Sequence, residues 1–253
     1  PWLRARLQAL AAHLTYRLDD FDTALASAQR LLADEVAAAD GVARQQCLRV
    51  LGSIHLQKAE LDAAREYFAR AYAEAANAGQ TLSAAAMLDN LATVEKRAGR
   101  YAEALRMAQE SLVLMRRAGA HADVALCLNG LGVLHQALLD PERAQACFDE
   151  GLAITEREGF VSTKGYLLAN LADLALLRGD LDRAALRADQ AIALARQHGY
   201  KGIQAWTYMI VARVQQRRGD LACARRSLAE GMALAAEIGL KSLWAGSALA
   251  WAG

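Results

Sequence analysis

The chain has 253 residues, of which 29 are Lys or Arg and 28 are Asp or Glu, and its formal net charge is +1. This balance argues against a general nucleic-acid or membrane-surface binder, and an apolar fraction of 55% excludes a disordered chain. Only two prolines and 6% aromatic residues are present, while good helix formers dominate. The composition therefore predicts an all-α fold.

A forty-residue repeat organises the chain. Glycine recurs in one column, meaning the same position in successive forty-residue units, at Gly79, Gly119, Gly159, Gly199 and Gly239. Small residues occupy two further columns. One runs from Ala24 to Ala224, and the other reads Ala12, Gly52, Ala92, Gly132, Ala172 and Ala212. We expect these two columns to face each other between paired helices, because helices approach closely only where side chains are small.

Each unit is predicted to form two helices. The units are taken as about 1–40, 41–80, 81–120, 121–160, 161–200 and 201–240, followed by a partial helix over 241–253, all within one repeat domain. Asp20, Asp140, Asp180 and Asp220 occupy the position that precedes the second helix, where a carboxylate caps backbone N–H groups. The recurring glycines fit helix C-termini, where a positive φ costs glycine nothing.

The first unit, 1–40, is the weakest match to the pattern, because Gln8 and Ala11 stand where the other units carry large residues. The second helices of the third and fifth units carry Ala108 and Ala188 where the second and fourth units carry Phe68 and Phe148, so we expect those two helix pairs to pack more tightly. The last segment stops inside an apolar pattern, which indicates a piece of a larger protein.

The repeat resembles the tetratricopeptide repeat (TPR) family in a forty-residue form. The motif is read at Leu48, Leu51, Gly52, His55, Ala64, Phe68 and Ala71, and again at Leu128, Leu131, Gly132, His135, Ala144, Phe148 and Gly151. The resemblance implies a right-handed superhelical TPR-like solenoid of about six helix pairs plus a truncated final helix. The Ala-, Arg- and Leu-rich composition of these repeats is similar to that of sensor regions of bacterial maltose-regulator-like transcriptional activators and related NTPase-coupled regulators.

In the TPR family the first helix of each pair lines a concave face that holds a peptide or partner helix. We carry the family's lining positions over to this sequence and add the asparagines discussed in the next paragraph. The candidate partner-binding residues are then Arg49, Asp89, Asn90, Lys96, Arg97, Asn129, Gln136, Tyr166, Asn170, Asp173, Trp206, Arg213 and Arg217. Counting every lining position, including Arg6 and Arg17, seven basic residues stand against two acidic ones. This excess predicts an acidic ligand, although long basic side chains also simply solvate an open groove.

Asparagine is the sharper signal within this face. Asn90 and Asn170 share a column, and Asn129 lies one position earlier in the unit between them. An amide both donates and accepts hydrogen bonds, so it can bind a peptide backbone whatever the sequence. The alternative is an amide that bridges neighbouring helices. Tyr166, Leu176, Leu177, Trp206 and Met209 would add an apolar half to the groove, or instead cover a neighbouring unit.

No catalytic motif stands out. Gly130-Leu131-Gly132 lies inside a predicted helix, so it is not a dinucleotide loop, and His55 and His135 are interpreted as packing residues. The cysteines, Cys47, Cys127, Cys147 and Cys223, form no C-x-x-C pair and read as buried, reduced thiols. We therefore predict no enzyme activity, no metal and no cofactor. There is no apolar run long enough to span a membrane. Reduced thiols are typical of a reducing compartment, so we expect a cytoplasmic location.

The predicted function is recognition of a protein or peptide, without direct nucleic-acid or membrane binding, as the sensing part of a larger bacterial regulator. Two alternatives stay open. One is a free-standing adaptor or co-chaperone that clamps a carboxylate with Arg49, Asn90 and Arg97. The other is the interaction domain of an enzyme whose catalytic domain lies elsewhere. A homo-oligomer formed through the terminal repeats is also left open.

Overall fold

The computed structural model describes residues 2–17, 20–35 and 39–238. Over these residues the chain forms twelve helices and no strand, so the all-α prediction is confirmed. Gly239 and the predicted partial helix 241–253 lie outside the described residues. The helices divide into two compact units, Pro1–Asp123 and Val124–Gly253. The prediction of a single repeat domain stays a prediction.

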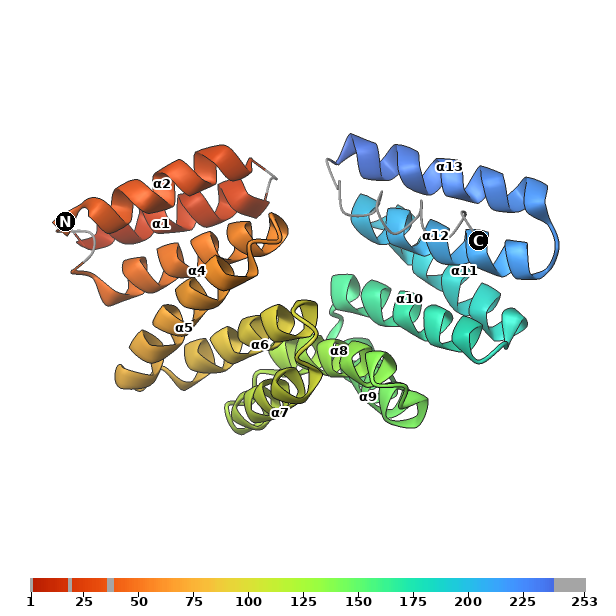
Figure 1. Ribbon diagram of the computed structural model, residues 1–253, viewed down its shortest axis with the longest axis horizontal. Helices are drawn as coiled ribbons and strands as arrows, with labels where there is room; N and C mark the ends of the chain where they lie inside the picture. Colours follow the sequence, from red (N-terminus) through yellow and green to blue (C-terminus); the bar gives the residue numbers. More distant parts are fainter. Residues whose placement is uncertain (1, 18–19, 36–38, 239–253) are drawn as a thin grey trace. The chain divides into compact units, whose positions relative to one another are not determined.

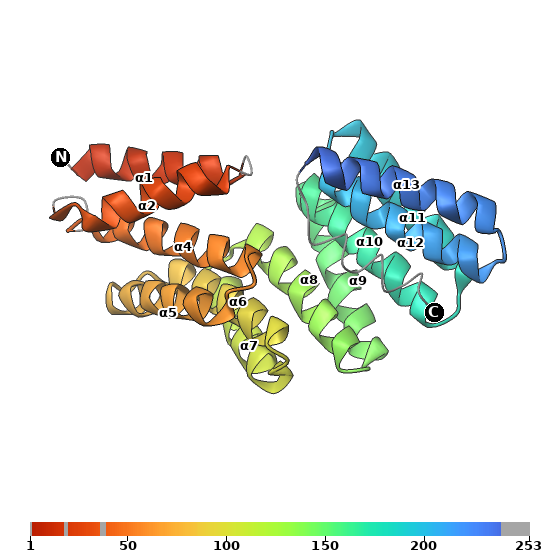
Figure 2. The ribbon, with the colours of Figure 1, turned by 45° about the horizontal axis from the view of Figure 1, so that its top comes forward.

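The first unit contains three helix pairs, drawn in red to yellow in Figure 1. They are α1 (Trp2–Arg17) with α2 (Phe21–Ala33), α4 (Gly41–Gln57) with α5 (Leu61–Asn77), and α6 (Thr81–Arg97) with α7 (Tyr101–Arg117). The second unit contains three more: α8 (His121–Ala137), which belongs to it from Val124 on, with α9 (Pro141–Glu158), then α10 (Val161–Leu177) with α11 (Leu181–Gln197), and α12 (Lys201–Arg217) with α13 (Leu221–Glu237). Every pair begins in the predicted forty-residue phase. Within each unit, Figures 1 and 2 show the helices lying side by side as hairpins.

We call the first helix of each pair the A helix and the second the B helix. The predicted caps of the B helices are confirmed. The side chains of Asp20, Asp140, Asp180 and Asp220 each accept a hydrogen bond from the backbone N–H three residues on, at 3.0 to 3.1 Å. Asp40 caps an A helix in the same way, accepting from the N–H of Ala43 at 2.9 Å.

The turns repeat every twenty residues. The glycines at 79, 99, 119, 159, 179, 199 and 219 all have positive φ, as the glycine column predicted for helix ends. Ala59 and Leu139 take the same left-handed conformation without being glycine, with φ of 60° and 58°. All of these turns therefore use one geometry, whichever residue occupies it.

The glycines of the A helices allow a close contact inside two of the helix pairs. An ideal Cβ placed at Gly52 would lie 2.8 Å from Phe68, and one at Gly132 would collide with Phe148. Gly52 and Gly132 of the small column therefore lie against the aromatic residues of their B helices. The expected contact with the Ala24 column stays a prediction. The side-chain volumes in the two columns compensate each other. Units with glycine in the small column have phenylalanine in the aromatic column, whereas units with Ala92 or Ala172 have Ala108 or Ala188 there.

The two histidines and four cysteines singled out in the sequence differ in their burial. His55 Nδ1 lies 2.5 Å from Glu60 Oε2, and its ring stacks on Tyr67 with centroids 5.2 Å apart. His135 is buried, and burial lowers its pKa below the ordinary value. Cys47 and Cys127 are buried as expected, and burial raises the pKa of the Cys47 thiol to about 11. Cys147 and Cys223 are only half-buried, which corrects the expectation that all four would be buried.

Candidate functional site

Two asparagines connect neighbouring A helices of the second unit. Asn170 Nδ2 on α10 donates to Asn129 Oδ1 on α8 at 2.8 Å, and both side chains are half-buried. The one-position offset between them in the sequence is what brings the two amides together. The structure therefore shows the bridging role that the sequence left as the alternative for Asn170.

A second polar network crosses all three A helices of this unit. Asp173 on α10 accepts from Gln136 Nε2 on α8 at 3.1 Å through one carboxylate oxygen, and from Arg213 Nη1 on α12 at 2.6 Å through the other. The Asp173 side chain is 19% exposed and that of Arg213 39%. The carboxylate therefore compensates the charge of Arg213 and fixes its position on the face.

Apolar side chains stand beside these networks. Leu126, Tyr166 and Trp206 occupy one column of α8, α10 and α12, and each is 40% to 50% exposed. Leu177 is exposed as well, but Leu176 is 1% exposed and belongs to the core, so its assignment to the groove was wrong. The three A helices thus present one large apolar side chain each in their first half and amide and charged groups further along, while Leu177 adds an exposed apolar side chain at the last residue of α10.

The candidate residues of the first unit are arranged differently. Arg97 Nη1 donates to the backbone carbonyl of Leu56 on α4 at 2.7 Å, which holds the guanidinium across the two A helices α4 and α6. Burial, and then the neighbouring Arg97, lower the pKa of Lys96, while Asp89 opposes the shift. Arg49, Asp89 and Asn90 are half-buried in the same two helices.

The predicted positive charge is distributed unevenly and is partly compensated. Arg6 binds Asp40 at 3.1 Å, and Arg213 binds Asp173. Arg97 donates to a carbonyl, which leaves its formal charge in place, and Arg217 is exposed. Most of the excess lies in the first unit, whereas the face of the second unit has only Arg213 and Arg217 against Asp173.

Sequence reasoning missed two features of the site. It placed Leu126 among the lining positions but did not single it out, although the shared column with Tyr166 and Trp206 was the available signal. It also did not foresee that Asp173 would join Gln136 and Arg213. The hollow of about 350 Å³ bordered by α9, α10 and α11 contains none of the candidate residues.

Other classes of site find no support in the part of the chain that the structure describes. No group of three or more His, Cys, Asp and Glu side chains there could hold a metal ion. None of the described helices combines the length and the apolar character that crossing a bilayer requires.

Helix pairs in forty-residue phase, stacked within each unit with polar side chains along their A helices, define a helical-repeat protein. Residues 83–157 match the family model described as tetratricopeptide repeat. The helix pairs on either side of these residues repeat the same phase and turns, so the TPR-like helical-repeat fold that the sequence predicted is confirmed for the described residues.

Solved structures share this fold. The chain is similar to a Rap protein complexed with Competence and Sporulation Factor, with 15% identity over 98% of this chain and 67% of that one and a TM-score of 0.82. It is also similar to BtubC from P. vanneervenii, with 20% identity over 89% and 92% and a TM-score of 0.63. A third similar structure is the Rap conjugation gene regulator of the plasmid pLS20 in complex with the Phr* peptide. It has 13% identity over 85% of this chain and 59% of that one, with a TM-score of 0.72. No curated protein matched the sequence.

Proposed function

We propose that this chain is a non-catalytic recognition domain that binds a peptide or a segment of a partner protein along the A helices α8, α10 and α12. The observation that carries the proposal is the hydrogen bond between Asn129 and Asn170. It uses one donor and one acceptor, and a pair of amides offers several more of each. The remaining groups suit the alternating N–H and C=O groups of an extended backbone.

The neighbouring groups would set orientation and preference. Asp173 holds Gln136 and Arg213 in place, so these side chains lose little further freedom when a ligand binds. Tyr166 and Trp206 offer exposed rings, which bury much apolar area at low cost in conformational entropy. A ligand with apolar side chains near these rings and a carboxylate near Arg217 would match the face best.

The first unit would offer a face of its own, with a preference for acidic ligands because basic residues are in excess there. Its residues are Arg49, Asp89, Asn90, Lys96 and Arg97. The fold shared with a Rap protein complexed with the Phr* peptide supports peptide binding by this architecture. We assign the chain to the ligand-sensing part of a larger bacterial regulatory protein that acts in the cytoplasm.

The test is selection from a display library of random twelve-residue peptides on the immobilised chain, followed by calorimetric titration of the enriched sequences. The double variant Asn129→Ala/Asn170→Ala should bind enriched peptides about tenfold more weakly or worse, because each lost amide hydrogen bond is worth about 1 kcal/mol. Asn77→Ala, at the exposed end of α5, is the matched control and should bind as the parent does. Failure to enrich any peptide, or equal affinity of the double variant, would contradict the proposal.

A further inference from the structure

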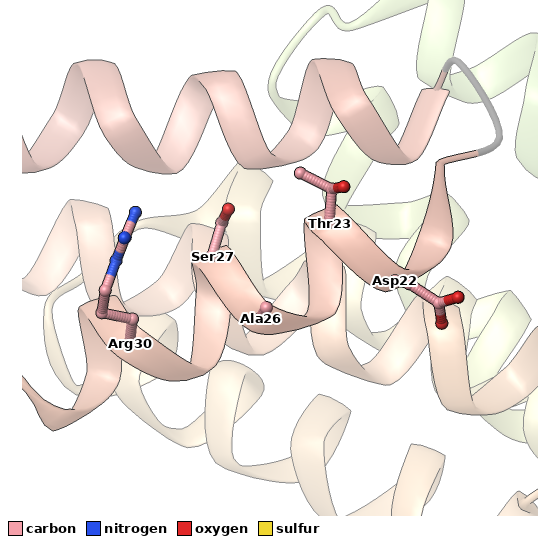
Figure 3. Close-up of a pocket in the computed structure, with 5 residues that line it drawn as sticks. All are labelled: Asp22, Thr23, Ala26, Ser27 and Arg30. Atoms are coloured by element: carbon pink, nitrogen blue, oxygen red, sulfur yellow. The ribbon is translucent and has the colours of Figure 1, made fainter.

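Two hollows in the part of the chain that the structure describes differ in how they are enclosed. The larger, of about 540 Å³, is lined by residues that Figure 3 shows along one side of α2: Asp22, Thr23, Ala26, Ser27 and Arg30. All five belong to one helix, so no second element closes around a ligand there. The smaller, of about 350 Å³, is lined by three helices of the second unit, α9, α10 and α11. We call it the α11 hollow, because most of its lining residues belong to that helix.

The floor of the α11 hollow is part of the core between two helix pairs. Leu168 on α10 is 4% exposed and belongs to the apolar cluster that also contains Phe148 and Leu152 of α9. Leu194 on α11 packs against the same cluster and also lines the hollow. Because both helix pairs are present and packed at this position, the hollow lies between stacked repeats and not at an end of the stack.

Arg187 explains why this space is open. Its column holds Tyr67 on α5 and Met107 on α7, and both of those side chains pack against apolar clusters that include the preceding helix pair. Arg187 Nη1 instead donates to Gln190 Oε1, about one turn further along its own helix, at 3.1 Å. The arginine side chain therefore lies along α11 and leaves open the space that an apolar side chain fills in α5 and α7.

The hollow is lined by two cations and one carboxylate. Lys164 Nζ on α10 lies 3.1 Å from Glu156 Oε1 on α9, so these two charges compensate each other. Arg187 donates to the neutral amide of Gln190, and among the described residues no carboxylate forms an ion pair with it. One positive charge therefore remains uncompensated beside an apolar floor.

The polar groups around this floor are mainly hydrogen-bond donors. A guanidinium has five N–H groups in a planar fork, and Arg187 uses one of them on Gln190. The ammonium group of Lys164 has three, and its ion pair with Glu156 engages one. The amide of Gln197 adds two more N–H groups to the lining. A carboxylate suits such a set, because a guanidinium binds it through two parallel hydrogen bonds.

We propose that the α11 hollow binds a small organic monocarboxylate, with its apolar body on Leu168 and Leu194 and its carboxylate on Arg187. The volume of the hollow is that of about a dozen water molecules at about 30 Å³ each, which suits a ligand of roughly ten non-hydrogen atoms. Glu156 repels a second negative charge, so a dicarboxylate binds less well. None of the lining residues is a candidate residue for peptide binding, so this site is independent of the proposed function.

Titration of the isotope-labelled chain with hydrocinnamate, followed by proton–nitrogen correlation NMR, tests the site. We expect a dissociation constant of about 1 mM or below, which is ordinary for a ligand of this size, with shifts in the amide signals of α9, α10 and α11 around the hollow. Hydrocinnamamide has the same body without the charge and should bind about tenfold more weakly or worse. Benzylmalonate adds a second carboxylate to the same body and should bind about threefold more weakly than hydrocinnamate.

Four variants locate the site. Arg187→Gln should weaken hydrocinnamate binding about tenfold or more, whereas Arg183→Gln changes an exposed arginine about one turn earlier on α11 and should bind as the parent does. Glu156→Gln should remove the disadvantage of benzylmalonate. Ala193→Phe places a ring at an exposed position of the lining and should abolish binding without changing the thermal melt.

The proposal is overturned if hydrocinnamate does not bind at about 10 mM, far above the expected dissociation constant. Equal affinity for the acid and its amide would also overturn it, and so would undiminished binding by Arg187→Gln or by Ala193→Phe. None of these measurements involves a peptide, so a failure here leaves the proposed peptide binding along α8, α10 and α12 unaffected, and a failure of peptide selection leaves this site unaffected.

Discussion

The ring of Phe148 on α9 occupies the space that a side chain at Gly132 on α8 would need. Alanine normally stabilises a helix relative to glycine by about 0.5 to 1 kcal/mol, but here its methyl group would overlap a ring that is fully buried. The close approach of α8 and α9 therefore depends on the absence of one carbon atom.

Gly132→Ala should lower the free energy of unfolding by about 1 to 3 kcal/mol, because overpacking outweighs the gain in helix propensity. Urea denaturation followed by circular dichroism measures the change. Gly41→Ala is the control, since its Cβ would meet nothing within 4 Å, and it should be neutral or slightly stabilising. The double variant Gly132→Ala/Phe148→Ala should cost less than the sum of the two single changes. Full additivity would show that these residues do not share the space.

Leu139→Gly should raise the free energy of unfolding by about 1 kcal/mol. Leu139 has a φ of 58° and is 89% exposed, so leucine is strained there and contributes little packing. Gly179→Ala, at an equivalent turn with a φ of 80°, should be destabilising by a similar amount. Thermal and urea melts of both variants measure the effect, and a destabilised Leu139→Gly would show that the leucine makes a contact worth more than its strain.

Asp40 should make stability depend on pH in the acidic range. Hydrogen bonds from Arg6 and then from the backbone of Ala43 hold its pKa below the ordinary value of 3.8. Because the folded-state pKa is lowered, the stabilisation is complete above about pH 5 and is lost as the pH falls through the folded-state pKa. Asp40→Ala should cost about 1 kcal/mol at pH 7, and its difference from the parent should shrink toward pH 2.5. A difference that stays constant over this range would exclude a role for the charge.

Arg217 should affect the binding of acidic peptides more than the binding of neutral ones. It is exposed on α12, whereas Arg213 is compensated by Asp173. For an acidic peptide obtained by selection, Arg217→Glu should weaken binding about fivefold, and raising the salt from about 50 to 500 mM should weaken binding to the parent chain. Arg225→Glu, exposed on α13, is the matched control. Affinity that does not change with salt would contradict the acidic preference.

The phase of the fold was predictable because it depends on local chemistry. Aspartates that precede B helices and glycines at positive φ act within a few residues of their own position, so the sequence alone locates the turns. The ring that lies over Gly132 was not predictable in this way. Which B-helix residue lies over Gly132 depends on how two helices cross, and the crossing is set by packing along their whole length.

The candidate site was predictable only as a face. Periodicity placed Asn129 and Asn170 on the exposed side of A helices, but whether an amide points to a ligand or to the next helix depends on the distance between α8 and α10. Leu176 and Leu177 are adjacent at the edge of the face, and one is buried while the other is exposed. The boundary between core and surface falls between them, and a pattern of 3.6 residues per turn does not resolve one residue.

The twenty-residue recurrence of left-handed turns means that each helix carries its own beginning and its own end. A forty-residue unit bounded by two such turns contains its own helix caps, the close contact between its two helices and both of its stacking surfaces. The gene can therefore lengthen or shorten by duplication or loss of whole cassettes without redesign of what remains, whereas an insertion of one or two residues inside a helix would shift every later side chain to a different side.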